Sequence, residues 1–232
     1  MTLTYAIADL HGRFDLLQAA LLQIKQHHSD REPGRIITLG DYIDRGPESR
    51  QVIERLMAGV DGGWQLVCLK GNHEDIMVKT LRVPLHPDWW IGNGGGTTLV
   101  SYGHEKSGQY RPDVVSAAHV DWVANLPTMI ADKHRIYVHA GIDRFVSLNE
   151  QDREVLLWKL YDFDDPGGHG DLHVVHGHHQ FEDGPVLHSG RTNLDTFAWA
   201  TGRLVVGVFD DDKAGGPIDL IELSGNPDPR FL

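Results

Sequence analysis

The 232-residue sequence contains very little cysteine, and its one thiol, Cys68, excludes two structural solutions. A single cysteine forms no internal disulfide and cannot supply a thiolate zinc cluster. The sequence also lacks any apolar run of 18 residues, and its start, "MTLTYAIADLHG", has neither the basic region nor the long apolar core of a signal peptide. We therefore expect a cytoplasmic protein with no membrane partner.

Positive charge is also scarce, because 21 Lys and Arg face 33 Asp and Glu, for a net charge of −12 with neutral histidine. Duplex nucleic acid and anionic membranes both favour Lys and Arg, so neither is expected as the main partner. A negative total charge leaves phosphate chemistry open, since a few local cations outweigh the global field. Histidine, by contrast, is abundant, with 15 residues, and imidazole is the commonest metal ligand.

The first 80 residues alternate between strand-like and helix-like segments. Apolar runs typical of strands occur at 3–8, 35–40 and 64–71, and amphipathic helical patterns occur at 13–28, 48–59 and 72–81. This β-α-β-α-β order predicts right-handed crossovers and a buried, largely parallel sheet. Residues 84–130 are less regular and are expected to form a helical insertion or cap, with Trp89 and Trp90 in its core.

The character changes after residue 135. Short β-type runs separated by Gly, Pro and Asp occur at 135–141, 172–179, 185–189, 192–195, 203–210 and 218–223. We expect this half to be richer in antiparallel strands. With no internal repeat and no low-complexity linker, residues 1–232 are expected to form a single α/β (α+β) domain with a two-layer β core flanked by helices.

Polar residues gather where the expected strands end. The sequence reads "ADLHG", "LGDYIDRG", "LKGNHE", "VHAG" and "VHGHH" at five such points. Because the carboxyl ends of strands line the ligand crevice of open α/β sheets, these ends should deliver one set of ligands to one place. The set is Asp9, His11, Asp41, Asn72, His139 and one histidine of the "HGHH" stretch at 176–179.

This ligand set predicts a metal centre without sulfur. Asp9 and His11 are two residues apart, so on an extended chain they point the same way. Oxygen and imidazole ligands suit Mn²⁺, Fe or Zn²⁺, and six ligands fit two ions bridged by a carboxylate, for which Asp41 is the central candidate. Each short motif taken alone is more often a turn, a surface pair or a helix cap, but together, in this order and each at a strand end, the motifs favour the metal centre. Eight other histidines fall outside the pattern and are expected at the surface: His27, His28, His86, His104, His119, His134, His169 and His173.

The ordered motifs "DLHGR", "GDYIDRGPES", "LKGNHE", "HAG" and "HGHH" resemble those of the calcineurin-like metallophosphoesterases. More narrowly, they are similar to the bacterial and bacteriophage branch of the phosphoprotein phosphatases, which act on phosphoserine and phosphothreonine. The resemblance covers about residues 4 to 209. It implies a four-layer α/β/β/α sandwich with mixed sheets and a small cap.

The resemblance also implies the role of each site residue. Asp9, His11 and Asp41 would hold a first metal ion, and Asp41, Asn72, His139 and His178 a second. His73 would be the general acid, oriented by Asp44. Arg45 and Lys70 would bind the phosphate, although the family usually carries arginine at the position of Lys70, and lysine lacks the bidentate fork.

These roles agree with the chemistry of phosphate esters. Two bound divalent ions, with manganese expected, would activate water as hydroxide, and a histidine beside a carboxylate is biased toward the imidazolium form that can donate a proton. The leading hypothesis is a protein serine/threonine phosphatase acting on a phosphorylated protein. A diadenosine tetraphosphatase acting on a small phosphorylated substrate is the alternative, and a non-catalytic phosphate-binding module is a third hypothesis.

Overall fold

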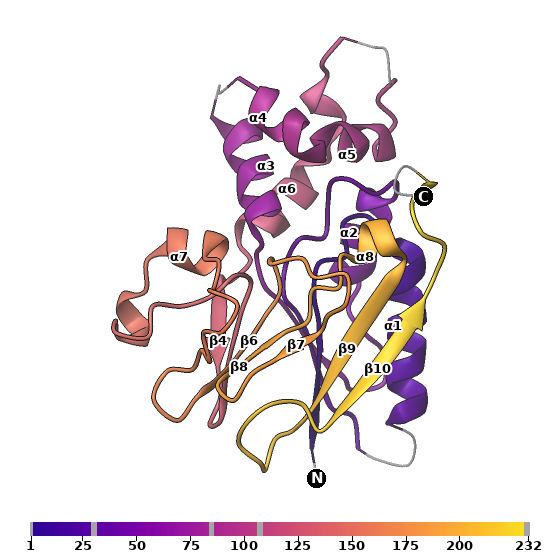
Figure 1. Ribbon diagram of the computed structural model, residues 1–232. Helices are drawn as coiled ribbons and strands as arrows, with labels where there is room; N and C mark the ends of the chain where they lie inside the picture. Colours follow the sequence, from indigo (N-terminus) through magenta and orange to yellow (C-terminus); the bar gives the residue numbers. More distant parts are fainter. Residues whose placement is uncertain (1, 29–31, 84–85, 106–108, 230–232) are drawn as a thin grey trace.

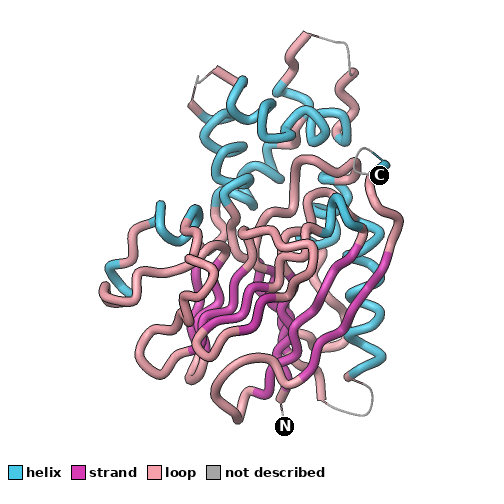
Figure 2. Tube along the Cα trace, in the orientation of Figure 1, coloured by secondary structure: helices cyan, strands magenta, loops and turns pink. Residues whose placement is uncertain are grey.

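The computed structural model describes residues 2–28, 32–83, 86–105 and 109–229 (Figures 1 and 2). These residues form two five-stranded mixed sheets with strand orders β10-β9-β1-β2-β3 and β4-β5-β6-β8-β7. The strands are β1 (Leu3–Ile7), β2 (Arg35–Thr38), β3 (Gln65–Cys68), β4 (Met129–Ala131), β5 (Arg135–Val138), β6 (His173–His176), β7 (Val186–Leu187), β8 (Arg191–Asn193), β9 (Arg203–Asp210) and β10 (Asp219–Ser224). Within these ranges, no helix is long and apolar enough to cross a membrane.

The first sheet confirms the expected β-α-β-α-β order. Strands β1, β2 and β3 run parallel, with Thr4 opposite Arg35 and Arg35 opposite Gln65. Helices α1 (Phe14–His27) and α2 (Ser49–Met57) make the crossovers. The apolar side chains of α1 recur at helical spacing and pack against the outer face of this sheet through Leu16, Leu17, Ala20, Leu21 and Ile24.

The second half of the chain is richer in antiparallel strand pairs than the first, as expected, but the centre of the second sheet is parallel. Its three central strands β5, β6 and β8 run parallel, and only the edge strands β4 and β7 are antiparallel. The long connection from β5 to β6, which carries helix α7 (Arg153–Trp158), allows the chain to return in the same direction. Strands β9 and β10 are antiparallel as expected, but they extend the first sheet. Strand β4 falls at the end of the range expected to form the cap.

The two sheets pack face to face, as the two-layer β core predicted. Side chains from both inner faces form one cluster, which includes Ala6, Ile37, Tyr137, Val175 and Phe209. Helix α7 contributes Leu156 to a third cluster on the outer face of the second sheet. The helix-sheet-sheet-helix order therefore confirms the four-layer sandwich.

A group of helices projects above the sheets at the top of Figure 1. It consists of α3 (Asn72–Arg82), α4 (Asp88–Trp90), a π-turn (Ile91–Gly95), α5 (Gly96–Ser101), a 3₁₀ turn (Pro112–Val114) and α6 (Ala117–Ala124). Trp90 is fully buried as expected, but Trp89 is 54% exposed, so the expectation that both lie in the core is wrong for Trp89. Two histidines expected at the surface, His28 and His173, are buried.

Candidate metal centre and catalytic site

The carboxyl ends of the parallel strands in both sheets meet on one side of the sandwich. Asp9 and His11 follow β1, and Asp41, Asp44 and Arg45 follow β2. Asn72 and His73 begin α3 directly after β3, His139 follows β5, and His178 follows β6. The structure therefore brings together all the expected ligand-bearing strand ends, and each ligand except the partly exposed His178 is buried.

The backbone is strained at these same positions. Among the described residues other than glycine, seven have a positive φ, and six of these were expected in the site: Asp9, His11, Asp41, Asp44, Arg45 and His178. Left-handed conformations of such residues cost on the order of 1–3 kcal/mol each and persist where the surrounding structure imposes them. Gly177 is also constrained, because a Cβ atom there would lie 2.7 Å from Asp9 Oδ2. The strand ends are thus held in conformations that direct their side chains inward.

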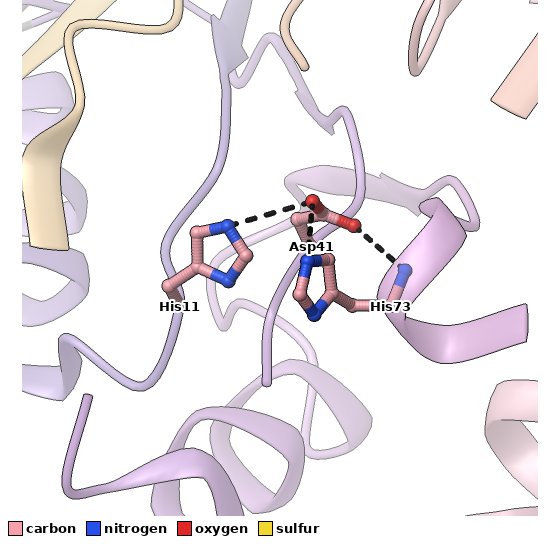
Figure 3. Close-up of side chains that lie close together, drawn as sticks. All are labelled: His11, Asp41 and His73. Atoms are coloured by element: carbon pink, nitrogen blue, oxygen red, sulfur yellow. Dashed lines mark hydrogen bonds and ion pairs between the residues drawn. The ribbon is translucent and has the colours of Figure 1, made fainter. Parts of the chain in front are cut away.

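Asp41 lies at the centre of the arrangement. Potential ligand atoms of His11, Asp41 and His73 lie within 4.8 Å of one another, and so do those of Asp41, His139 and His178. Figure 3 shows the first group, in which Asp41 Oδ2 lies 3.5 Å from His11 Nε2 and 3.9 Å from His73 Nε2. Since Asp41 belongs to both groups, it is placed as a ligand shared by two ions would be.

Two histidines, His11 and His139, each direct an unprotonated ring nitrogen toward the Asp41 carboxylate. His11 Nδ1 donates to the Ile43 carbonyl at 2.8 Å, and His139 Nδ1 donates to the Leu39 carbonyl at 2.9 Å. Each Nε2 is then an acceptor and lies 3.5 Å from an Asp41 oxygen. Burial lowers the pKa of His11 and His139, which favours the neutral form that ligates metals. Because these Nε2 atoms and the Asp41 oxygens are all acceptors, a cation would fit between them.

Asn72 and His178 complete the second group. Asn72 Oδ1 lies 2.8 Å from His139 Nε2 and 3.2 Å from His178 Nδ1, and burial lowers the pKa of His178 to about 3. If the Asn72 amide were reversed, its nitrogen would face the same atoms. A cation bound among these residues would favour the orientation in which the amide oxygen faces it. An amide oxygen, two neutral imidazoles and a carboxylate form a donor set that suits a borderline divalent ion.

Asp9 lies behind this cluster and also fits a cation. Its Oδ2 accepts a hydrogen bond of 2.6 Å from the His178 backbone, while Oδ1 has no hydrogen-bond partner among the described residues. Burial, Asp195 and Asp41 raise the pKa of Asp9 well above its ordinary value. A nearby divalent ion would offset this accumulated negative charge and use the unsatisfied oxygen.

His73 differs from the other site histidines. Its Nδ1 lies 2.8 Å from Asp44 Oδ2. Burial would lower the pKa of His73, but Asp41 and the hydrogen bond to Asp44 outweigh it, so the pKa is raised. The imidazole is therefore biased toward the protonated form, which suits a proton donor and does not suit a metal ligand.

Two residues of the cap hold Asp44, and the sequence reasoning missed both. Trp90 Nε1 donates to the Asp44 oxygens at 3.1 and 3.2 Å, and Thr98 Oγ1 donates to Oδ1 at 2.6 Å. Asp44 is fully buried, and these bonds fix the direction from which it meets His73. No short-range pattern links these residues to Asp44, which lies 46 and 54 positions away.

Glu74 binds the backbone of Asp41 and of two neighbouring residues. Its carboxylate accepts hydrogen bonds from the backbone N–H groups of Asp41 at 2.8 Å, Tyr42 at 2.9 Å and Gly71 at 2.9 Å. Burial and the negative charge of Asp41 raise the pKa of Glu74 to about 7. Glu74 thus holds the chain after β2 against the chain after β3, a role that the sequence reasoning missed.

Arg45 lies across the opening of the site. Its guanidinium approaches His11 Nε2 at 3.1 Å and His73 Nε2 at 3.2 Å. It lines a cavity of about 290 Å³ together with Asp41, Asn72, His73, His178, His179 and Gln180. Arg45 can therefore meet an anion that enters beside Asp41 and His73.

Lys70 occupies a different position from Arg45. Its Nζ atom donates to the Ala124 carbonyl at 2.7 Å, and burial lowers its pKa. Lys70 is absent from the lining of the cavity that holds Arg45. A role in phosphate binding would require the lysine to give up its bond to the cap, and that role stays a prediction.

Comparison with known proteins shows the family. A model of the calcineurin-like phosphoesterase family matches residues 3–208. Since this match covers most of the chain, the protein belongs to the calcineurin-like phosphoesterase family.

Curated relatives carry two different names. The chain is 32% identical over 91 residues to serine/threonine-protein phosphatase 2 of Escherichia coli strain K12. The aligned region covers 39% of this chain and 38% of that protein. The chain is 24% identical over 158 residues to serine/threonine-protein phosphatase 1 of Salmonella typhimurium strain LT2, with 67% and 66% covered. It is also 37% identical over 71 residues to a symmetrical bis(5'-nucleosyl)-tetraphosphatase of Pseudomonas fluorescens, with 31% and 22% covered. The chain thus spans less than two thirds of the length of these relatives.

Solved structures share the fold. A putative diadenosine tetraphosphatase superposes with a TM-score of 0.61 at 18% identity, covering 97% of this chain and 94% of that one. A protein serine/threonine phosphatase from Saccharomyces cerevisiae superposes with a TM-score of 0.60 at 13% identity, covering 98% and 81%. At these identities the likeness establishes the architecture alone.

Proposed function

We propose that this protein is a phosphomonoesterase that removes phosphate from phosphoserine or phosphothreonine in proteins. The observation that carries the proposal is the His73–Asp44 pair beside Asp41, because an alkoxide leaving group needs a proton and His73 is biased to hold one. Relatives named as serine/threonine phosphatases support the same substrate class.

The ligands would be divided between two divalent ions, with Mn²⁺ as the proposed metal and Fe or Zn²⁺ as alternatives with the same ligand preferences. Asp9, His11 and Asp41 would bind one ion, and Asp41, Asn72, His139 and His178 the other. When bound, the ions supply an acidified water and neutralise charge on the phosphate. The fit rests on the shared carboxylate and the convergent lone pairs described above.

The protein side chains would complete the reaction. Arg45 would turn its guanidinium from the two imidazoles to the phosphate oxygens as the substrate enters, and His73 would then carry its proton on Nε2. Water would give up one proton to solvent as it adds to phosphorus, the bond from phosphorus to the ester oxygen would break, and His73 would pass its Nε2 proton to the departing oxygen. The products are a free hydroxyl side chain and inorganic phosphate, and no phosphorylated protein intermediate is required.

A diadenosine tetraphosphatase is the second candidate. Relatives and a structural neighbour carry that name, and of the residues that line the cavity only Arg45 is an arginine or lysine. A phosphoanhydride has a better leaving group than a serine ester and depends less on the general acid. Its cleavage would therefore be less sensitive to loss of the His73 proton.

The test is a side-by-side measurement of kcat/KM on a phosphoserine peptide and on diadenosine tetraphosphate, with Mn²⁺-loaded protein and a chelated control. We expect a chelator-sensitive preference for the peptide. The reverse preference, with ADP as product, would assign the second candidate. Binding of phosphate without turnover of either substrate would contradict both and would favour a non-catalytic module.

A further inference from the structure

Trp89 is the exposed member of the tandem pair Trp89–Trp90 and has no role in the reaction described so far. All six tryptophans of the chain lie in the described ranges, and Trp89 is the one among them that is exposed, at 54%. One face of its ring is covered by Trp158, at a centroid distance of 5.8 Å and an interplanar angle of 16°. The exposed part of this side chain is a large apolar surface to leave in water.

This stacked pair adjoins the metal centre. The Trp158 ring meets His178 edge-on at a centroid distance of 6.0 Å, and His178 belongs to the group around Asp41. Trp158 ends helix α7 of the second sheet, whereas Trp89 lies on α4 of the cap. The pair thus bridges two separate parts of the fold at the margin of the site.

The position of Trp89 is fixed relative to the proton donor. The next residue, Trp90, is fully buried and donates to Asp44, which in turn holds His73. The Asn93 amide donates to the Trp89 carbonyl at 2.7 Å. A rigid aromatic face at a set distance from the reacting group is suited to select among substrates, because little entropy is lost when a ring binds it.

We propose that Trp89, backed by Trp158, is a stacking subsite for a planar ring that the substrate carries beside its phosphate. Aromatic faces stack on other rings with a preference for offset geometry, which the Trp89–Trp158 pair already shows. The inference rests on the proposed phosphoesterase function, and it identifies Trp89 as a determinant of specificity.

Two kinds of substrate can supply such a ring at the required distance. In an extended peptide, a residue two or three positions from the phosphorylated one lies roughly 7–10 Å away. The ring centroids of His178, Trp158 and Trp89 follow one another at 6.0 and 5.8 Å. The base of a nucleoside polyphosphate, separated from the reacting phosphate by a ribose and a further phosphate, has a similar reach. The shared chemistry is a flat π surface, and the test distinguishes the sources.

The kinetic test compares matched substrates on Trp89→Leu, Trp89→Phe and the parent. One pair is a phosphoserine peptide with Trp or with Leu three positions away, and the other is diadenosine tetraphosphate against tripolyphosphate. Loss of stacking worth about 1–2 kcal/mol corresponds to a roughly five- to thirtyfold fall in the preference for the ring-bearing member, seen in KM more than in kcat. Trp89→Phe should retain part of the preference. Phe145→Leu, which changes a side chain 91% exposed, is the control that should keep the parent preference.

A second readout does not depend on turnover. Quenching of tryptophan fluorescence by ADP and by a phenylalanine-containing phosphopeptide is measured with the chelated protein, and Trp89→Leu should remove the ring-dependent part. Quenching of the chelated protein, together with no hydrolysis of either substrate by the Mn²⁺-loaded protein, would support the subsite while contradicting the proposed function. An unchanged preference in Trp89→Leu, or an equal loss for ring-bearing and ring-free substrates, would overturn the subsite. An effect confined to the peptide pair or to the nucleotide pair would support it and identify the source of the ring.

Discussion

Asp44 contacts both the proposed proton donor and the cap. It bonds His73 on one side and Trp90 and Thr98 of the cap on the other, and none of its surface is exposed. A buried carboxylate is stable as an anion only when its hydrogen-bonding capacity is used. The cap therefore sets the direction of the group that orients the proton donor.

Replacing Trp90 with Phe should therefore weaken proton donation without touching a metal ligand. Loss of the indole N–H from a charged acceptor costs about 1.5–3 kcal/mol, so kcat on a phosphoserine peptide should fall about tenfold or more. Nitrophenyl phosphate, whose leaving group needs no proton, should be affected much less. His73→Asn is the reference and should show the same pattern with a peptide loss of about 10²–10⁴.

Equal losses on the two substrates in Trp90→Phe would mean that the variant disturbs the cap in general. Equal losses in His73→Asn would remove His73 as the proton donor. Thr98→Val provides a second, smaller change on the same carboxylate and should follow the behaviour of Trp90→Phe.

At the scale of elements, the strands and their ends were the predictable part. Alternating or continuous apolar runs mark β1, β2, β3, β5 and β6, and each ends in a polar motif that the structure places at the site. The direction of the strands in the second sheet was not predictable, because the apolar run of β6 reads the same in either orientation. The bonds of Trp90 and Thr98 to Asp44, and the exposure of Trp89, depend on how the cap folds back, which no local pattern encodes.

A substitution at Lys70 tests whether its bond between the end of β3 and the cap stabilises the fold. Its ammonium bonds the Ala124 carbonyl next to the C-terminus of α6. We expect Lys70→Met to lower the free energy of unfolding by about 1–3 kcal/mol, measured by urea denaturation, and to leave inhibition by inorganic phosphate unchanged. Arg45→Met is the matched control and should weaken phosphate inhibition. Weaker inhibition in Lys70→Met as well would restore the lysine to the phosphate site.

At the scale of the whole molecule, buried neutral histidines make stability depend on pH. Burial lowers the pKa of His173 to about 4, and its Nε2 lies 2.8 Å from Thr192 Oγ1. Between pH 6.5 and 4 the unfolded chain binds a proton that the folded chain does not, so stability is lost as the pH falls through this window, by up to about 3 kcal/mol.

His173→Gln removes this titration while keeping a polar partner for Thr192. In urea unfolding at a series of pH values, the parent should lose more stability than the variant between pH 6.5 and 4. Parallel profiles would show that His173 is protonated in the folded protein as readily as in the unfolded chain.

The most direct test of the account is the metal content of the purified protein, measured by elemental analysis after loading with Mn²⁺ and together with phosphatase activity. We predict two ions per chain, full loss of activity on chelation and a higher melting temperature in the loaded form. Asp41→Asn should lose both the bound metal and the activity, because Asp41 is the carboxylate shared by the two proposed ligand sets. Activity that survives in metal-free protein, or a fully active Asp41→Asn variant that keeps both ions, would contradict the shared-carboxylate metal centre.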